Sequence, residues 1–302
     1  MKQLNNSSTP KGRKVLKRRI LFFLFLILAV IASILALYLK RTVDQERKQD
    51  KIEEEITTEK EKDGVGNLHK KYKDMIGWLE IKGTGFSYPV MQTGIEGHHK
   101  DDWQYYLHRD VHGEYSFYGT PFLDVRCTVE SDNLIIYGHN INGRRYFGYL
   151  QNFREETFFK EHPKFSFTAV GEKEKEYCVV SVLETDKYAE YYSFTDYGNE
   201  EDYCRMVEKI LSHSKFQSEA AKKMKNEIEE SSAEAFFRNY QFVTLSTCRT
   251  MIFRQITRSK ILSSHRKLGF LLRKNKGVKS SPAWEFGFLL RKNKEDLKCT
   301  RN

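Results

Sequence analysis

The feature that most constrains this 302-residue chain is an uncharged run of about twenty residues, Ile20–Leu39. A helix of that length, rising about 1.5 Å per residue, matches the hydrocarbon thickness of a bilayer. A cleaved secretory leader has a shorter apolar region and then small residues, whereas this run ends at Lys40 and Arg41. The run therefore predicts an uncleaved transmembrane anchor over residues 20–39.

Charge is concentrated at the two ends of the chain. Residues 1–19 hold seven Lys and Arg and no acid, and residues 249–302 hold fifteen against three acids, so the total of +10 leaves −9 for residues 20–248. The positive-inside rule therefore predicts a cytoplasmic N-terminus, with everything after Arg41 outside the cell. A nucleic-acid partner is not expected, because such proteins carry a basic face on the folded domain itself.

Two predicted strands end in reactive side chains. Apolar, aromatic and β-branched residues fill Tyr240–Cys248, which predicts a strand that has one buried face and ends in a cysteine. About a hundred residues upstream, Asn133–His139 is a second apolar strand, and it ends in a histidine. An isolated cysteine is more often a buried core thiol. Two strands that each deliver a reactive group at their end are, however, what a Cys–His nucleophilic site requires.

The rest of the central region predicts short strands and one helical insertion. Phe165–Val170 and Glu176–Thr185 form a predicted hairpin, and apolar residues three and four apart predict a helix over 200–213. A charged, mainly helical stretch over 217–237 leads into the cysteine strand. Many strands with short turns and one helical insertion predict a mostly-β barrel.

The cysteines and the loop histidines do not predict a metal site. The five cysteines form no Cys-x-x-Cys pair and their number is odd, so neither a zinc site nor a disulfide framework is indicated, and at least one free thiol is expected. Four histidines lie between residues 92 and 116, namely His98, His99, His108 and His112. Their spacing fits no metal-binding helix, and we expect solvated loop histidines.

Taken together, these motifs resemble the sortases, and class B in particular. The resemblance rests on Thr244–Cys248 (Thr-Leu-Ser-Thr-Cys) and Tyr137–Asn140 (Tyr-Gly-His-Asn), with support from Ile76–Ile81, Gly119–Asp124 and the helical insertion. It covers about residues 68–248. The fold that it implies is an eight-stranded sortase-type β-barrel, mostly β with helices, with an N-terminal helix and a helical insertion before the cysteine strand.

The resemblance implies a membrane-anchored cysteine transpeptidase of cysteine endopeptidase type, on the outer face of a Gram-positive-type membrane. Such enzymes cut a C-terminal sorting pentapeptide of a surface protein after its Thr. They pass the acyl group, through a thioacyl-enzyme, to an amine of a peptidoglycan precursor or to a pilin lysine. Cys248 would be the nucleophile and His139 the general acid–base group. Ser246, Thr247 and Tyr137 are expected to bind the substrate, and no cofactor is expected.

An arginine completes the family's site by stabilising negative charge on the carbonyl oxygen. It lies on the strand after the cysteine, about ten residues onward. That spacing indicates Arg258, with Arg254 and Arg249 as alternatives. A further interpretation is that none of the three is catalytic.

The tail departs from the family pattern. Residues 249–267 alternate poorly for a closing strand, and Gly269–Lys276 recurs as Gly287–Lys294 eighteen residues later. A reading frame shifted after Cys248 is one interpretation, in which Arg258 is coincidental and the barrel lacks its last strand. The other is a genuine basic extension that contacts anionic wall polymer or lipid.

Five segments are therefore predicted. They are a cytoplasmic tail over 1–19, the anchor over 20–39, a charged stalk over 40–67, the sortase domain over 68–265 and the basic tail over 266–302. Two further functions stay open. One is a Cys–His hydrolase that passes the acyl group to water. The other is an impaired sortase-like protein that binds sorting peptides without turnover.

Overall fold

The computed structural model describes residues 10–94, 102–141, 145–185, 190–237, 239–248 and 283–292. The chain divides into two compact units, Met1–Ile52 and Glu53–Asn302. In the first unit the described residues are helical and the apolar side chains of Ile20–Leu39 are exposed. This helix is long and apolar enough to cross a membrane, with a mean hydropathy of 3.2 over its best window. It can therefore serve as an anchor by its length and composition.

The helix α1, Pro10–Lys71, continues from the first unit into the second. It bends at Gly64, where φ is 74° and ψ is 167°, values outside the helical region that glycine adopts readily. Within the second unit Ile56 and Leu68 are only 3% and 2% exposed. The structure thus divides the predicted stalk over 40–67, because its residues from 53 onward bury apolar side chains in the barrel's own unit.

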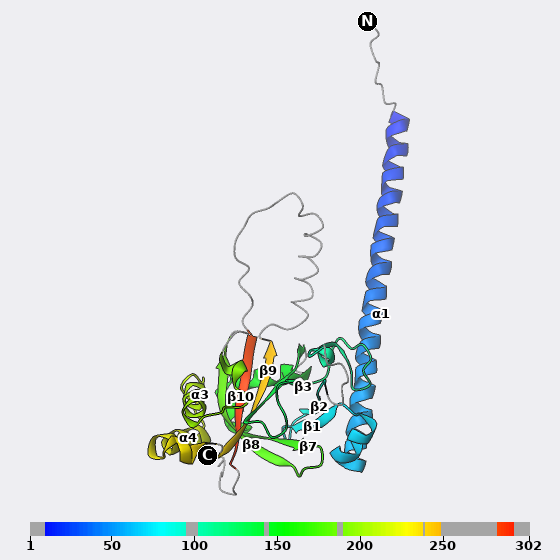
Figure 1. The fold of residues 1–302 in the computed structure, drawn as a ribbon. Helices are drawn as coiled ribbons and strands as arrows, with labels where there is room; N and C mark the ends of the chain where they lie inside the picture. Colours follow the sequence, from blue (N-terminus) through cyan, green and yellow to red (C-terminus); the bar gives the residue numbers. More distant parts are fainter. Residues whose placement is uncertain are drawn as a thin grey trace. The chain divides into compact units, whose positions relative to one another are not determined.

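Eight strands form a closed barrel in the order β1-β2-β3-β4-β9-β10-β8-β7. Their bounds are Met75–Glu80 (β1), Ser87–Met91 (β2), Phe122–Leu123 (β3), Asn133–Tyr137 (β4), Lys164–Ala169 (β7), Lys175–Glu184 (β8), Tyr240–Cys248 (β9) and Ala283–Lys292 (β10). A separate small pair is formed by Asn140–Ile141 (β5) and Arg145–Tyr146 (β6). The predicted eight-stranded barrel is confirmed, and Figure 1 shows β9 and β10 side by side in it.

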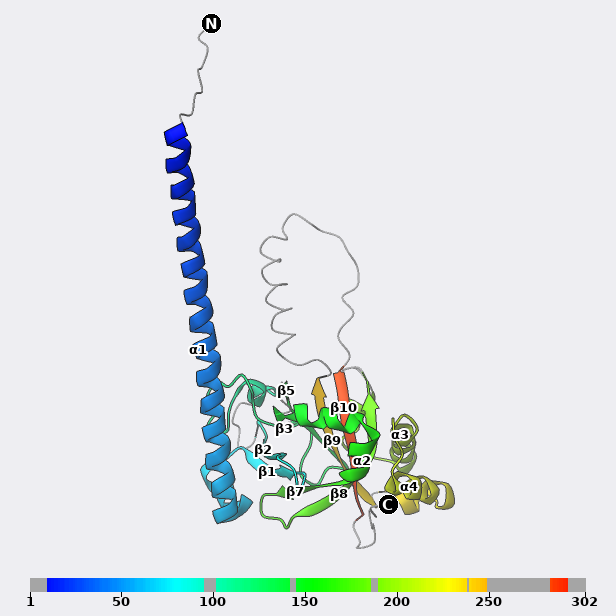
Figure 2. The ribbon, with the colours of Figure 1, turned by 180° about the vertical axis from the view of Figure 1, so that it is seen from behind.

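Short helices fill the connections between the strands. Their bounds are Tyr105–His108 (η2), Phe147–Arg154 (η3), Glu156–Glu161 (α2), Glu190–Ser193 (η4), Glu200–Ser212 (α3), Glu219–Glu230 (α4) and Ala233–Phe236 (α5). The side chain of Asn199 caps α3 by accepting a hydrogen bond from the backbone N–H of Asp202. The helical insertion before the cysteine strand is confirmed, and α3 and α4 lie together on one side of the barrel (Figure 2).

Strand β9 belongs to two hydrophobic clusters, one on each face of the sheet. Val243 and Leu245 lie in the cluster that fills the barrel. Tyr240 and Phe242 lie in the cluster shared with α3, α4 and α5. Successive residues of a strand point to opposite faces, so this sequence of large residues buries both faces of β9. The strand that ends in Cys248 is therefore held firmly along its length.

Strand β10 closes the barrel between β8 and β9. It runs antiparallel to both, with Ala283 opposite Cys248 and Lys292 opposite Tyr240. The sequence predicts a tail over 266–302, whereas the structure places residues 283–292 of that tail in the sheet. The apolar and aromatic residues of Ala283–Leu290 account for this difference, because strands β8 and β9 require a partner for their edges.

Candidate active site

The two strands that carry the candidate reactive residues are neighbours in the barrel. β4 and β9 pair in parallel, and the last register pair joins Tyr137 to Ser246. The ladder extends one residue further, because the backbone N–H of Gly138 donates to the carbonyl of Ser246 over 3.0 Å. Continuing this register by one more residue brings His139 beside Cys248, on chains about 4.8 Å apart. The ends of β4 and β9, which lead into His139 and Cys248, therefore lie side by side at one end of the barrel.

The imidazole of His139 is buried, with only 9% of the residue exposed. It is hydrogen-bonded to the backbone carbonyl of Leu107, and its Nε2 has no hydrogen-bond partner within the described residues. We infer that Nδ1–H donates to Leu107, which leaves Nε2 as the basic nitrogen. Burial lowers the pKa of His139 to about 4, and the nearby His108 contributes to this shift. The hydrogen bond to Leu107 acts in the opposite direction and raises the pKa, but its effect is smaller. The ring is therefore a neutral base at neutral pH.

Gly119 lets the backbone pass close to the carbonyl of Leu107, the group to which His139 is hydrogen-bonded. The residue Gly119 has φ of 64°, and a Cβ there would lie 2.4 Å from the carbonyl oxygen of Leu107. The next residue, Thr120, donates its backbone N–H to the carbonyl of Tyr106 over 2.9 Å. The hydroxyl of Tyr106 in turn donates to Asp74 over 2.8 Å. These contacts fix η2, and through it the carbonyl that orients His139.

Aromatic side chains form a wall beside the strand ends. The hydroxyls of Tyr192 and Ser246 share a hydrogen bond of 2.9 Å. Tyr192 stacks on Tyr137, with ring centroids 6.2 Å apart, and the exposed Trp103 meets Tyr137 edge-on at 6.3 Å. Because Ser246 and Cys248 are two residues apart on a strand, their positions fall on the same face of β9. An extended peptide that reaches position 248 could lie along this wall.

An acidic residue behind the wall anchors Tyr137. The hydroxyl of Tyr137 donates a hydrogen bond to the carboxylate of Asp124 over 2.9 Å. The guanidinium of Arg126 makes a bidentate contact with the same carboxylate, over 2.9 and 2.7 Å. Burial opposes the ionisation of Asp124, but the hydrogen bonds from Arg126 and Tyr137 outweigh it and hold the pKa of the carboxyl below its usual value. Arg126 also donates to the backbone carbonyl of Tyr192 over 2.8 Å, so one ion pair supports both tyrosines.

The described cysteines differ sharply from a reactive thiol. The Cys127 thiol is buried and donates to the carbonyl of Asn133 over 3.3 Å, and burial raises its pKa to about 12. Burial also raises the pKa of the Cys204 thiol. Both are free, which confirms the expectation of a free thiol, whereas Cys178 is disulfide-bonded. Cys248 is the last residue of β9, the strand that pairs with β4 two residues before the buried histidine.

The other predicted substrate residues flank this position. Ser246 and Thr247 are only 5% and 4% exposed, and Tyr137 is half-buried. The hydroxyl of Thr247 has no hydrogen-bond partner within the described part of the chain. Their roles stay predictions.

The predicted arginine falls outside the described residues. Arg249, Arg254 and Arg258 all lie between β9 and β10, in a range that the structure does not describe. On β10 itself, the positions opposite Ser246, Thr247 and Cys248 are Glu285, Trp284 and Ala283. Arg291 pairs instead with Gln241, near the far end of β9. Strand β10 therefore has no arginine position beside Cys248.

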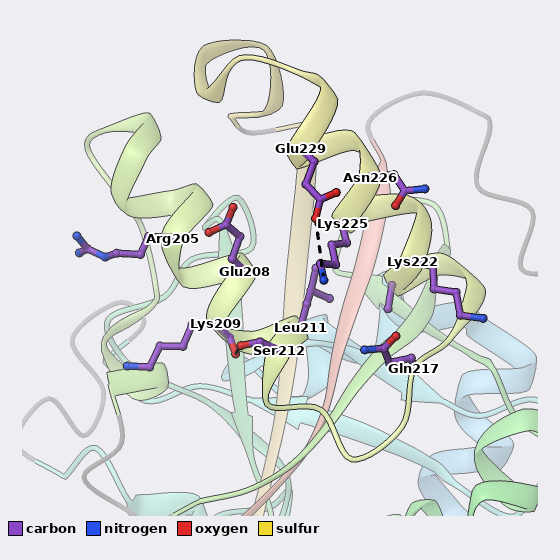
Figure 3. Close-up of a pocket in the computed structure, with 11 residues that line it drawn as sticks. Arg205, Glu208, Lys209, Leu211, Ser212, Gln217, Lys222, Lys225, Asn226 and Glu229 are labelled. Carbon is purple, nitrogen blue, oxygen red and sulfur yellow. Dashed lines mark hydrogen bonds and ion pairs between the residues drawn. The ribbon is translucent and has the colours of Figure 1, made fainter.

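A cavity of about 520 Å³ lies away from these strand ends, between α3 and α4 (Figure 3). Its charged lining side chains come from those two helices. Lys225 approaches Glu229 at 4.0 Å, Lys222 pairs with Glu219, and Lys209 pairs with Glu190. Because these lysines already have carboxylate partners, we assign no chemistry to this cavity.

Several residues of the site carry no signal in the sequence. Leu107 and His108 lie about thirty residues before His139 in the short helix η2, and Tyr192 lies in the short helix η4. Both helices are too short to show an apolar periodicity in the sequence. His108 is exposed, as expected of a loop histidine, yet its ring contacts His139. The one available signal is Gly119, since a glycine before Thr120 and a proline is typical of a tight turn.

Comparison with known proteins identifies the family. No family model matches the chain. Sortase B of Listeria monocytogenes is 32% identical over 191 residues, which are 63% of this chain and 68% of that protein. The chain belongs to the sortase B family. Sortase B of Staphylococcus aureus is 27% identical over 184 residues, which are 60% of this chain and 66% of that protein. The resemblance to class B sortases is thus confirmed.

Solved structures of sortase B share the fold. A Staphylococcus aureus sortase B–substrate complex matches with a TM-score of 0.56 at 20% identity, covering 84% of this chain and 98% of that one. A sortase B complexed with triglycine matches with the same TM-score and identity, covering 84% and 99%. Sortase B from B. anthracis, in complex with AAEK1, matches with a TM-score of 0.52 at 23% identity, covering 76% and 85%.

Proposed function

We propose that this member of the sortase B family is a transpeptidase whose nucleophile is Cys248 and whose general acid–base group is His139. The observation that carries the proposal is the parallel pairing of β4 and β9, because the adjacent ends of these two strands lead into His139 and Cys248. Membership of the family and the unpartnered, buried Nε2 of His139 support it. The thiols of Cys127 and Cys204 are buried, and burial raises their pKa values, which further favours Cys248 as the nucleophile.

The first half-reaction would form a thioester. The neutral His139 takes the proton of the Cys248 thiol as the sulfur attacks the carbonyl carbon of the scissile bond. The tetrahedral adduct then collapses, the C–N bond breaks, and the imidazolium gives its proton to the leaving amine. The acyl group stays on sulfur, and His139 is again neutral. Burial lowers the pKa of His139 to about 4, so the ring is unprotonated at neutral pH and its Nε2 lone pair is available when the thiol attacks.

The second half-reaction would transfer the acyl group to an amine. The incoming amine attacks the thioester carbon, His139 accepts a proton from the amine, and the departing thiolate takes that proton back. No net proton is exchanged with solvent over the full cycle. The amine would come from a peptidoglycan precursor or a pilin lysine, as the family resemblance implies. A sortase B of the same fold has been obtained with triglycine, which is consistent with an amine acceptor.

Oxyanion stabilisation requires a further cation. Arg258 is the proposed residue, with Arg254 and Arg249 as alternatives, because a guanidinium supplies charge and directed donors together. The peptide would be a C-terminal sorting pentapeptide cut after Thr. It would lie along the wall formed by Trp103 and Tyr192 and bind Tyr137, Ser246 and Thr247.

The apolar helix would anchor the enzyme, with its N-terminus in the cytoplasm and the barrel outside. The seven basic residues before Ile20 support this orientation. Surface proteins with sorting signals would then reach the enzyme on the outer face of the membrane.

A second candidate is an impaired protein that binds sorting peptides without turnover. Strand β10 sets Ala283 rather than an arginine opposite Cys248, and the three candidate arginines lie outside the described residues. Without a cation, the oxyanion loses a stabilisation that typically contributes about 10²–10³-fold to kcat. A hydrolase, which passes the acyl group to water, remains the third outcome of the experiment below.

The test is a transfer assay with the full chain in detergent micelles. A panel of sorting-type pentapeptides is incubated with triglycine, and products are followed by mass spectrometry. We expect an amine-linked product with one peptide class, and its loss in Cys248→Ala by about 10³-fold or more. Cys127→Ala is the matched control, since that thiol is buried against the carbonyl of Asn133, at the start of β4, and its loss should leave transfer intact.

The other outcomes separate the candidates. Cleavage without amine capture, even at high triglycine concentration, would identify a hydrolase. Peptide binding without any product would identify the impaired protein. Transfer that survives in Cys248→Ala would overturn the assignment of the nucleophile.

A further inference from the structure

A second imidazole lies against the candidate base. The rings of His108 and His139 have centroids 5.3 Å apart and planes tilted by 39°. His108 ends η2, and its neighbour Leu107 supplies the carbonyl that is hydrogen-bonded to His139. Two consecutive residues of one short helix therefore contact the same ring, one through its backbone and one through its side chain.

The contact is built into the fold. The backbone carbonyl of His108 accepts a hydrogen bond from Ser116 over 3.1 Å, and the carbonyl of Arg109 accepts one from the hydroxyl of Thr120 over 2.9 Å. Together with the close approach of Gly119, these bonds hold the end of η2 against the strand end. The His108 ring is thus positioned by its backbone on both sides.

The two rings differ in their access to water. His108 is exposed, whereas His139 is 9% exposed and its Nε2 is buried without a partner in the described chain. Water stabilises a positive charge far better on an exposed ring than on a buried one. The pKa of His108 is also lowered, first by its partial burial and then by Arg109, whereas Asp102 raises it. The burial of His108 is less complete than that of His139, so His108 is still the easier ring to charge. The titratable neighbours of His139 are His108 and, by register, Cys248.

We propose that His108 is a positioning residue of the active site, which packs on His139 and takes up the first proton of the pair so that His139 remains an unprotonated base. This inference rests on the proposed role of His139. When the pH falls, the proton goes to the exposed ring, and its charge then opposes a second proton on the buried ring 5.3 Å away. Transfer would consequently persist at a pH at which an ordinary histidine has lost its basicity.

The test compares His108→Phe with the wild-type full chain in detergent micelles. Phenylalanine at position 108 keeps an aromatic ring over His139, so His139 stays buried, and burial is the larger cause of the lowered pKa of His139. The substitution removes only the charge that His108 can carry. His108→Gln is the second variant, in case the larger ring is poorly accommodated. His112→Phe is the matched control, because His112 is an exposed histidine of the same loop whose ring contacts Tyr72 instead.

Two readouts are required. NMR titration with ¹³Cε1-labelled histidine, assigned with His139→Gln, gives the pKa of His139 whether or not the protein is active. We expect both His108 variants to raise it by about one pH unit, the effect of losing a like charge roughly 5 Å away, with no change in His112→Phe. The acid limb of kcat/KM should move upward with it, which lowers kcat/KM about threefold near pH 4.5 and leaves it unchanged near pH 8.

The failures of the two proposals are distinguishable. If His139 titrates at the same pH in the wild type and both His108 variants, the inference is wrong, even when all three proteins transfer peptides. The pKa of His139 could instead shift as expected while the variants stay active and their pH profile of kcat/KM stays the same. In that case His139 is not the base, and the proposed mechanism fails. A fall in kcat/KM that is equal at every pH would assign His108 a purely structural role.

Discussion

Strand β9 has one neighbour on each side, and the two neighbours differ in almost every respect. On one side β4 runs parallel to it, with five register pairs between buried residues such as Leu134 and Val243. On the other side β10 runs antiparallel to it over nine pairs. Strand β4 ends just before His139, the candidate base, whereas β10 has Ala283 opposite Cys248.

The difference separates two tasks of the barrel. Parallel strands end at the same edge, so β4 and β9 can deliver His139 and Cys248 to one place without a further turn. An antiparallel neighbour begins where its partner ends, and its first residues alone can reach that edge. β10 therefore closes the sheet, while the described partners of His139, the Leu107 carbonyl and the His108 ring, come from η2.

The largest expected effect concerns the closing strand. Ending the chain at residue 282 removes β10 and leaves β8 and β9 without their shared partner. We expect the free energy of unfolding to fall by at least about 4 kcal/mol, since several ladder hydrogen bonds of roughly 1 kcal/mol each are lost. Denaturant unfolding, followed by tryptophan fluorescence, measures it.

With the disulfide of Cys178 reduced in every sample, a matched truncation at residue 292 keeps β10 and should unfold like the full chain. Equal stability of both truncated proteins and the full chain would show that residues 283–292 do not close the barrel. The interpretation of a shifted reading frame after Cys248 would then be favoured.

The next effect concerns the loop on the β4 side. Gly119→Ala should cost about 2–3 kcal/mol, because it combines a positive φ with a Cβ only 2.4 Å from the Leu107 carbonyl. Displacement of that carbonyl should also lower kcat/KM. Gly171→Ala is the control, since Gly171 has φ of 80° but nothing within 4 Å of the added Cβ, and about 1 kcal/mol is expected. Equal losses in the two variants would mean that the close approach is unimportant.

The buried histidine should make stability depend on pH. The folded state binds a proton at His139 only near pH 4, whereas the unfolded chain binds one near pH 6.5, so unfolding takes up a proton between these values. Stability contributed by the neutral ring is present above pH 6.5 and is lost as the pH falls toward 4. Between pH 7 and 5 we expect a loss of about 2 kcal/mol that His139→Gln does not show.

Urea unfolding of both proteins at the two pH values measures this difference. His213→Gln serves as a control at an exposed histidine at the end of α3. An identical pH dependence in the wild type and His139→Gln would contradict the burial of a neutral ring.

The smallest effect concerns the wall beside β9. Tyr192→Phe removes a hydroxyl that shares a 2.9 Å hydrogen bond with Ser246, and about 1 kcal/mol of stability should be lost. A double-mutant cycle with Ser246→Ala isolates the pair. Additive losses in the cycle would show that the two hydroxyls do not interact, and the wall would then be supported by Asp124 and Arg126 alone.

The same contrast explains what could be predicted from the sequence. The strands that end in Cys248 and His139 have strong apolar patterns, so both were predictable, and β9 matches its predicted bounds. Their pairing follows from the register, which no local pattern encodes. Leu107, His108 and Tyr192 reach the site from η2 and η4, short helices whose position depends on turns and long-range hydrogen bonds.

The predicted boundary of the barrel domain at residue 265 failed to include β10 for a related reason. The repeated Gly-Phe-Leu-Leu-Arg-Lys-Asn-Lys segments have the same local pattern, yet only residues of the second copy lie in a described strand. Which copy pairs with β9 is decided by distance along the chain and by the register with β8, and the sequence pattern contains neither.

The central claim is that Cys248 and His139 act as one pair at the ends of β9 and β4, and the most direct measurement is of the covalent intermediate. The full chain in detergent is incubated with a cleavable sorting-type peptide and no amine, quenched in acid, digested and analysed by mass spectrometry. We predict an acyl adduct on the Cys248 peptide that is absent in Cys248→Ala and strongly reduced in His139→Gln. Peptide cleavage without an adduct on Cys248, or an adduct on Cys127 or Cys204 instead, would contradict the account.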